Sequence, residues 1–181
     1  MTMAPHRGSQ RARQEKATTL PPAERAREIA LRLLTHSPRS AAQLREGLLS
    51  RDVEPAVADH VIARYIDVGL VDDAGLAVVI ARTRHAERGI AARVIAQELR
   101  RKGFSDDDIA HALEPITREA EHEAAARLAR RRWERMTGVP GDIRARRVVA
   151  YLGRKGYGPG LAFTLVKDLA KADSEVQALG E

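Results

Sequence analysis

The chain has 181 residues, no cysteine and a net charge of +6. The absence of cysteine excludes disulfides, thiol catalysis and sulfur-ligated zinc, and it fits a reducing cytosol. No apolar stretch approaches the roughly 18 residues of a membrane span, and the basic N-terminal residues lack the apolar core of a secretory signal. We therefore expect a cytoplasmic protein that does not engage a membrane.

Residues 1–22 mix Arg, Gln, Thr, Pro and Gly without periodicity, which predicts a disordered basic tail. The apolar residues that follow recur at spacings of three and four, the pattern of an amphipathic helix. Ser40 is placed to cap a second helix, and Pro55 to open a third helix that ends at Gly69. Residues 23–74 are thus predicted to form one three-helix repeat.

The same arrangement is predicted twice more, in residues 75–117 after a connector at 70–76 and in residues 118–172, with residues 173–181 fraying. No window alternates as a strand does. We predict an all-α fold, an elongated tandem array of three three-helix repeats. The helices expected in the second and third repeats span residues 77–88, 90–102, 106–116, 118–136, 142–155 and 159–172.

An internal repeat supports this organisation. The segments Glu98–Phe104 (ELRRKGF) and Tyr151–Tyr157 (YLGRKGY) both place a Leu four residues before a Gly, which an aromatic residue follows. A weaker copy in the first repeat has Asp52 where the others have Gly103 and Gly156. Glycine at this position fits the left-handed conformation that commonly ends a helix.

Residues 82–104 join an Arg-rich helix to an Ile-x-x-Glu-Leu-x-x-Lys-Gly-Phe element, and residues 151–157 echo the second half of that stretch. Ser37–Ser40 and Val68–Asp73 add two further short motifs. Over about residues 25–172 this pattern resembles the RecX family, bacterial regulatory proteins that modulate the RecA recombinase. The chain departs from the family pattern at Asp52, a position that is usually Gly or small, and at Asp108, which is more often apolar.

The resemblance implies an elongated protein that lodges in the groove of the RecA filament on single-stranded DNA. There it would inhibit strand exchange, ATP hydrolysis and co-protease activity. We expect a regulator without catalytic activity of its own, acting as a monomer, with no cofactor and no metal. Whether DNA is also touched directly is left open.

Positive charge is concentrated in the third repeat, where residues 127–155 hold ten basic and only two acidic residues. We expect these side chains to contact phosphates or acidic filament residues. The alternative is a solvated helix face with internal pairs such as Arg130–Glu134 or Arg131–Glu134. The candidate contact residues are Arg82, Arg88, Lys102, Arg127, Arg130, Arg131, Arg144, Arg147, Arg154 and Lys155.

Two other classes of function, a nucleic-acid-binding protein and an enzyme, make different demands on the sequence. A general nucleic-acid-binding protein would grip phosphates directly with these arginines, and its affinity would fall steeply with salt. An enzyme would need a catalytic constellation, and the six histidines form no i, i+4 pair and have no obvious Ser or carboxylate partner in sequence. The sequence therefore favours a binding protein.

Four motifs have two interpretations each. Trp133 lies on an apolar stripe and is expected in the core, although it could stack on a nucleobase. Phe104 and Tyr157 are expected to seal contacts between repeats rather than to enter a partner's pocket. Ser105–Asp108 is expected to cap a helix rather than to bind a metal. Gly156–Gly160 is expected to end one helix and begin the next, because it lacks the Lys-Ser/Thr and the preceding strand of a phosphate loop.

Overall fold

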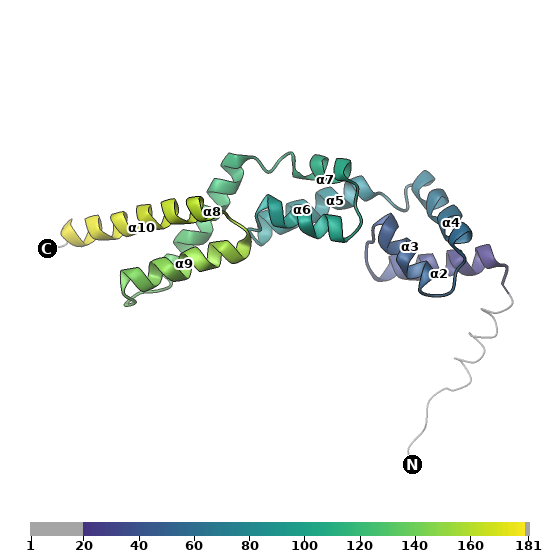
Figure 1. The fold of residues 1–181 in the computed structure, drawn as a ribbon, viewed down its shortest axis with the longest axis horizontal. Helices are drawn as coiled ribbons and strands as arrows, with labels where there is room; N and C mark the ends of the chain where they lie inside the picture. Colours follow the sequence, from purple (N-terminus) through teal and green to yellow (C-terminus); the bar gives the residue numbers. More distant parts are fainter. Residues whose placement is uncertain (1–19, 180–181) are drawn as a thin grey trace, which may run out of the picture. The chain divides into compact units, whose positions relative to one another are not determined.

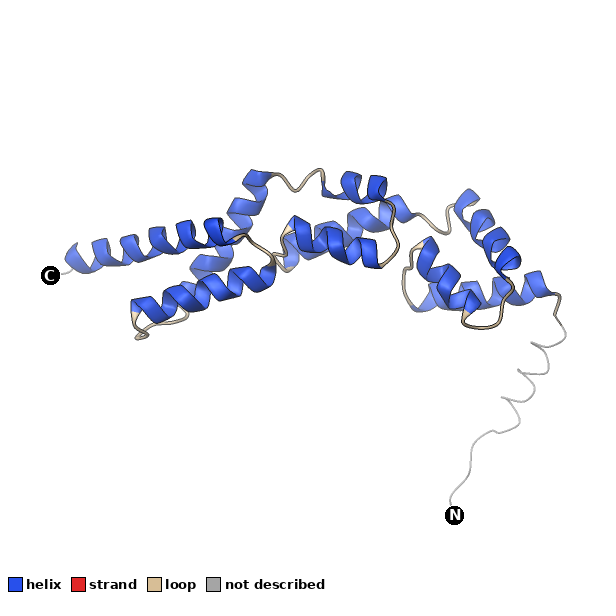
Figure 2. Ribbon diagram, viewed as in Figure 1, coloured by secondary structure: helices blue, strands red, loops and turns tan. Residues whose placement is uncertain are grey.

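The computed structural model describes the backbone of residues 20–179 and the side chains of residues 20–175. Regular structure in this range is helical, with no strand, which confirms the predicted all-α fold (Figure 2). The predicted disordered tail lies almost entirely outside the described residues. The elements labelled in Figure 1 are α2 (Pro22–His36), α3 (Ala41–Leu49), α4 (Pro55–Asp67), α5 (Asp73–Arg82), α6 (Ala92–Arg101), α7 (Asp106–Leu113), α8 (Arg118–Glu134), α9 (Gly141–Lys155) and α10 (Pro159–Leu179), and a π-helical turn spans Thr83–Glu87.

The first repeat, α2 to α4, forms a compact unit that extends to Leu76. Ser40 caps α3 as predicted: its Oγ accepts a hydrogen bond from the Gln43 amide (3.1 Å), and the Gln43 side chain accepts one from the Ser40 amide (3.3 Å). Pro55 occupies the first turn of α4, also as predicted. The apolar faces of the three helices meet in one core: Ala26, Ala30, Leu33, Leu44, Leu48, Val53, Ala58, Val61, Ile62, Tyr65 and Val71.

The second compact unit begins within α5 and holds both the second and the third repeat. Hydrogen bonds join these two repeats just before α6. The Ala91 amide donates to the Lys155 carbonyl at the end of α9 (2.9 Å), and the Ala92 amide donates to the Glu121 carboxylate near the start of α8 (2.8 Å). Lys155 Nζ donates back to the Arg88 carbonyl (2.7 Å). Basic residues of both repeats are therefore held close to each other.

The third repeat packs α8, α9 and α10 around Trp133, which is 3% exposed. Trp133 Nε1 donates a hydrogen bond to the Asp173 carboxylate (2.9 Å), so its polar atom is satisfied inside the repeat. The core interpretation of Trp133 is confirmed, and its alternative as a base-stacking residue is wrong. The predicted apolar stripe is buried throughout, with Ala125, Ala129 and Trp133 on α8 and Met136 just beyond its end.

The first helix of the second repeat begins earlier than predicted. α5 starts at Asp73, inside the predicted connector 70–76 and before the proposed repeat boundary at residue 74. The reason is local: Asp72 Oδ1 accepts a hydrogen bond from the Gly75 amide (2.9 Å). This bond satisfies one of the free amides of the first turn, so the helix can begin at an acidic residue.

The last helix runs further than predicted. α10 continues to Leu179, so the expectation that the chain frays from residue 173 is wrong for residues 173–179. Asp173 explains the difference, because its carboxylate binds both Trp133 and Arg144. These contacts fix α10 beyond the end predicted at about Ala172.

The residues that occupy the glycine position of the internal repeat share one backbone conformation. Gly103 and Gly156 have φ angles of 81° and 97°, as expected for left-handed helix ends, and Asp52 has a φ of 58°. Asp52 is the one non-glycine with a positive φ in the part of the chain that is described. The weaker third copy of the repeat is therefore a true structural equivalent, at a steric cost that glycine avoids.

Replacing Asp52 with Gly should therefore stabilise the protein. We expect the free energy of unfolding to rise by about 0.5–1 kcal/mol, because the left-handed conformation is strained with a Cβ and unstrained without one. Urea denaturation followed by circular dichroism measures this. Gly156→Ala is the matched opposite, since a Cβ there would clash with Val94, and it should destabilise. A loss of stability in Asp52→Gly would contradict the prediction.

The remaining sequence motifs have structural roles. Phe104 and Tyr157 are 5% and 3% exposed, so neither ring is free to enter a partner's pocket. Burial raises the pKa of Tyr157 to about 12, and the charge of Glu121 adds to this. Ser105 Oγ accepts a hydrogen bond from the Asp108 amide (3.1 Å), which confirms the helix cap.

Candidate interface on α8 and α9

Helix α8 has three distinct faces because its residues repeat at spacings of three and four. One face carries the alanines and Trp133 of the core. The other two carry arginines and are exposed, and each borders a hollow in the protein surface. Because the small apolar residues of α8 are buried in the core, most of its arginines face the solvent.

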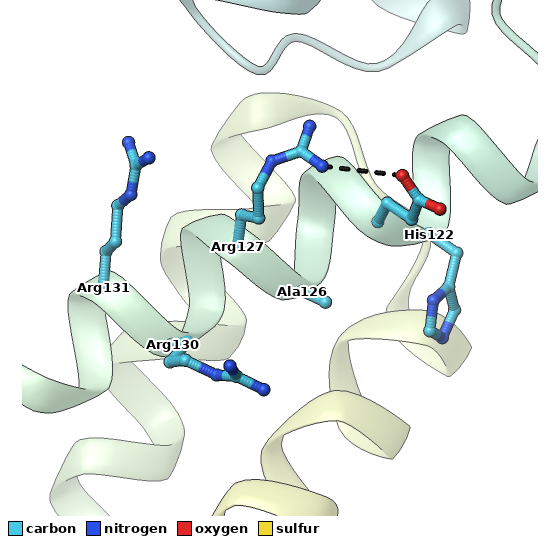
Figure 3. A pocket seen from close by; sticks show the side chains of 6 residues that line it. His122, Ala126, Arg127, Arg130 and Arg131 are labelled. Atoms are coloured by element: carbon cyan, nitrogen blue, oxygen red, sulfur yellow. Dashed lines mark ion pairs between the residues drawn. The ribbon is translucent and has the colours of Figure 1, made fainter.

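The first hollow has a volume of about 350 Å³ and is shown in Figure 3. Arg127 pairs with Glu123 across one helical turn (3.6 Å), drawn as the dashed line, and this leaves the charge of Arg127 partly compensated. Arg130 and Arg131 extend away from that pair. The residues that line this hollow are His122, Glu123, Ala126, Arg127, Arg130 and Arg131.

The second hollow, which we name the Tyr151 pocket, has a volume of about 300 Å³. It lies between α8 and α9, and its lining consists of Leu128, Arg131, Arg132, Arg135 and Tyr151. The half-buried Tyr151 ring has the Arg132 guanidinium carbon 5.9 Å and Lys155 Nζ 5.7 Å from its centroid. No carboxylate lines the pocket among the described side chains, so its surroundings are strongly positive.

Helix α9 extends this positive surface. Arg147 precedes Tyr151 by one turn and Arg154 follows it by three residues, so both lie near Tyr151 on the helix surface, and both are exposed. Arg88 of the second repeat lies next to this surface, because Lys155 Nζ donates a hydrogen bond to the Arg88 carbonyl. We call the resulting surface the basic face, and it consists of Arg88, Arg131, Arg132, Arg135, Tyr151, Arg147, Arg154 and Lys155.

The cations of the basic face are not neutralised by neighbouring carboxylates. Across the described side chains, none of its arginines or Lys155 forms an ion pair, and the pairs of Arg130 or Arg131 with Glu134 that the solvated-face alternative suggested are absent. Uncompensated cations gathered on one surface raise the local potential and attract polyanions. This arrangement fits a phosphate backbone or an acidic protein surface.

Comparison with known proteins places the three repeats in one family. Family models describe the first, second and third three-helix domains of RecX, and they match residues 26–64, 72–113 and 119–166. The chain belongs to the RecX family. The resemblance seen in the sequence is therefore confirmed, and the basic face lies in the third RecX domain with Arg88 added from the second.

Curated relatives are similar over most of their length. The regulatory protein RecX of Thermobifida fusca is 41% identical over 149 residues, which cover 82% of this chain and 80% of that protein. The RecX of Streptomyces coelicolor is 38% identical over 154 residues, 85% and 82% of the two chains. That of Mycolicibacterium smegmatis is 38% identical over 147 residues, 79% and 78% of the two chains.

Solved RecX structures share the fold. The crystal structure of RecX from Lactobacillus salivarius has a TM-score of 0.70 at 22% identity, over 82% of this chain and 96% of that one. A second crystal structure of a regulatory protein RecX has a TM-score of 0.67 at 22% identity, over 93% and 81%. This likeness supports the tandem arrangement of three-helix RecX domains.

Arg144 corrects the predicted site. It was expected to be exposed and to contact a partner, but its side chain is only 16% exposed. Its guanidinium lies 4.2 Å from the Trp133 ring centroid and pairs with Asp173 (2.6 Å), and its Nη2 donates to the Trp133 carbonyl (3.2 Å). Arg144 thus packs against Trp133 in the core of the third RecX domain. Its acidic partner is 29 residues away in sequence, in the segment that was predicted to fray.

The stretch that carried the RecX resemblance is largely structural. Arg84, in the π-helical turn, donates two hydrogen bonds to Glu98 of α6 (2.8 and 2.7 Å), and these bonds lower the pKa of Glu98 below its ordinary value. Arg82 is exposed at the end of α5 and Lys102 is half-buried at the end of α6. Neither is among the residues that line the two hollows of α8.

Sequence reasoning missed Tyr151, and it counted Arg132 and Arg135 among the charges of residues 127–155 without including them among the candidate contact residues. A signal was present, because Leu128, Arg131, Arg132 and Arg135 are spaced by three, one and three residues, as on one face of a helix. Tyr151 was noted only as part of the internal repeat. Its place opposite that face depends on how α8 and α9 pack, which no local pattern contains.

Neither a metal site nor a membrane segment is found in the described residues. No group of three or more His, Asp or Glu side chains there could hold a metal ion, Ser105–Asp108 included. No helix there is long and apolar enough to cross a bilayer. The basic face, with its exposed cations without ion pairs among the described side chains, is the candidate functional site of this RecX-family chain.

Proposed function

We propose that this RecX-family protein is a cytoplasmic regulator that binds the RecA filament on single-stranded DNA and inhibits its recombinase, ATPase and co-protease activities. The family membership supports a regulatory role, and the basic face supports a polyanionic target. The protein acts by occupying the filament groove and catalyses no reaction itself. It binds as a monomer, without a cofactor.

The observation that carries the proposal is the set of cations without ion pairs on one compact unit of the protein. A nucleoprotein filament presents phosphates and acidic side chains along its length, and arginine binds both through paired hydrogen bonds. Because Lys155 is bonded to the Arg88 carbonyl, the second and third RecX domains can present their cations to the same target. Such a surface binds without needing a catalytic group.

The test is the DNA-dependent ATP hydrolysis of RecA. Adding this protein at amounts up to equimolar with RecA should lower the rate of hydrolysis progressively, because bound regulator blocks the working filament. ATP hydrolysis by the protein alone is the control for contaminating activity and should be absent. A folded preparation that leaves the RecA rate unchanged over the whole range would exclude the proposal.

A second candidate function rests on the same arginines. A general DNA-binding protein would use them to hold phosphates, and its affinity would fall by about one log unit per log of salt for each phosphate engaged. Such a protein would bind bare DNA as tightly as it binds the filament. Comparing the two affinities at one salt concentration separates the candidates, since a RecA regulator prefers the filament.

A further inference from the structure

The Tyr151 pocket combines an aromatic ring with clustered cations, and we propose that it binds single-stranded DNA directly. In this arrangement a nucleobase stacks on the Tyr151 ring while neighbouring phosphates bind the arginines of α8. The inference rests on the proposed function and deepens it. In the RecA filament, the Tyr151 pocket contacts the DNA strand rather than an acidic surface of RecA.

The Tyr151 ring is the one aromatic ring that lines this pocket among the described residues, because exposed Phe163 on α10 lies outside it. Trp133 and Tyr157 are each 3% exposed, whereas Tyr151 is half-buried and lines an open pocket. Tyr151 packs against the core of the third RecX domain, so the ring is held in place. A fixed, partly exposed aromatic ring is a suitable platform for a base, since little freedom is lost on binding.

The cations around the ring are positioned for phosphates. Arg131 and Arg132 lie in the last turn of α8, Arg135 directly follows its end, and all three line the pocket. Each offers a guanidinium that can bind a phosphate through two hydrogen bonds, and none is engaged in an ion pair with a described carboxylate. Successive phosphates of one strand can therefore be met by successive arginines.

The cations that lie near the ring make only weak contacts with its face. The distances of Arg132 and Lys155 from the Tyr151 centroid, 5.9 and 5.7 Å, are near the outer limit of about 6 Å for a cation–π contact. Such weak contacts can be exchanged for stronger ones to phosphate when a base approaches the ring. The bound strand would then have its base on Tyr151 and its phosphates beside Arg132 and the other arginines of the pocket, while Lys155 stays bonded to the Arg88 carbonyl.

An acidic peptide is the competing ligand, and the aromatic ring argues against it. A carboxylate would use the arginines but would gain nothing from the face of Tyr151, whereas a nucleobase uses both parts of the pocket. The volume of about 300 Å³ is at the lower end of the range for small-ligand sites. That size suits one base and its phosphates better than a folded segment of another protein.

The experiment measures binding of the full-length protein to a fluorescently labelled oligo-dT strand by anisotropy. Tyr151→Leu should weaken binding about tenfold or more, because stacking on the ring is lost while every cation remains. Tyr151→Phe keeps the ring and should bind as the wild type does. Phe163→Leu is the matched control, since Phe163 is an exposed aromatic residue on α10 that does not line the pocket. Circular dichroism and thermal melting verify that each variant is folded.

Photocrosslinking gives a second, residue-level measurement that does not depend on a variant. An oligonucleotide that carries 5-iododeoxyuridine should crosslink to the wild-type protein at Tyr151, identified by mass spectrometry of the digested complex. Failure of the wild type to bind bare strand, an unchanged affinity of folded Tyr151→Leu, or crosslinks confined to other residues would each overturn the proposal. Weaker binding of Tyr151→Leu to the RecA filament but not to bare strand would also overturn it and assign the pocket to a protein ligand.

The RecA assay keeps this inference separate from the proposed function. If the wild type inhibits RecA while Tyr151→Leu retains the wild-type affinity for oligo-dT, the regulatory function stands and the DNA contact fails. If the wild type binds oligo-dT through Tyr151 but leaves RecA hydrolysis unchanged, the DNA contact stands and the regulatory function fails.

Discussion

The triple substitution Arg131→Glu, Arg135→Glu and Arg147→Glu should raise the concentration needed to inhibit RecA by more than tenfold. These arginines are exposed and form no ion pair within the described residues, so their replacement turns attraction to a polyanionic or acidic target into repulsion. Stability should change by less than about 0.5 kcal/mol for each substitution, because exposed side chains without partners contribute little to it. Inhibition of DNA-dependent ATP hydrolysis measures the first effect, and thermal melting the second.

A control with the same change in net charge separates a local effect from a general one. Arg27, Arg64 and Arg118 are also exposed and lie outside the basic face. Their triple replacement by Glu should leave inhibition within about twofold of the wild type if the basic face is the contact surface. Equal loss of inhibition in both triple variants would show that only the total charge matters. Full inhibition by the first triple variant would show that the basic face is merely solvated.

The fold was predictable because its determinants are local in sequence. Apolar spacing indicated the helices. The position shared by Asp52, Gly103 and Gly156 indicated the helix ends, because a left-handed conformation there involves a single residue whose place is readable from the sequence. The core position of Trp133 followed from its place on the apolar stripe of α8. Each of these features depends on residues within one or two helical turns.

The site was only partly predictable because it depends on contacts between distant segments. Charge density correctly indicated that α8 and α9 carry exposed cations, but it could not separate Arg147, which is exposed, from Arg144, which is paired with Asp173. The π-helical turn that places Arg84 beside Glu98 has no recognisable sequence signal. Both cases depend on contacts between residues far apart in sequence, and the spacing of neighbouring residues does not predict such contacts.

The cluster of Trp133, Arg144 and Asp173 should be the most sensitive polar site of the third repeat. Arg144→Ala is expected to lower the free energy of unfolding by about 2 kcal/mol or more, because it removes an ion pair and a cation–π contact and leaves Asp173 without its cation. Trp133 is the one tryptophan of the chain. Its fluorescence therefore reports unfolding of this domain directly, and urea titration followed at that signal measures the loss.

Arg147→Ala is the matched control, since it removes the same side chain one turn further along α9 at an exposed position. It should change the free energy of unfolding by less than about 0.5 kcal/mol. Asp173→Asn keeps an acceptor for the Trp133 indole but loses the charge, so its effect should be intermediate. Combined with Arg144→Ala, it should add little further loss, because the two residues act through one contact. Equal stability of Arg144→Ala and Arg147→Ala would contradict the structural role of Arg144. Arg144 would then count as a partner-contacting residue, as the sequence predicted.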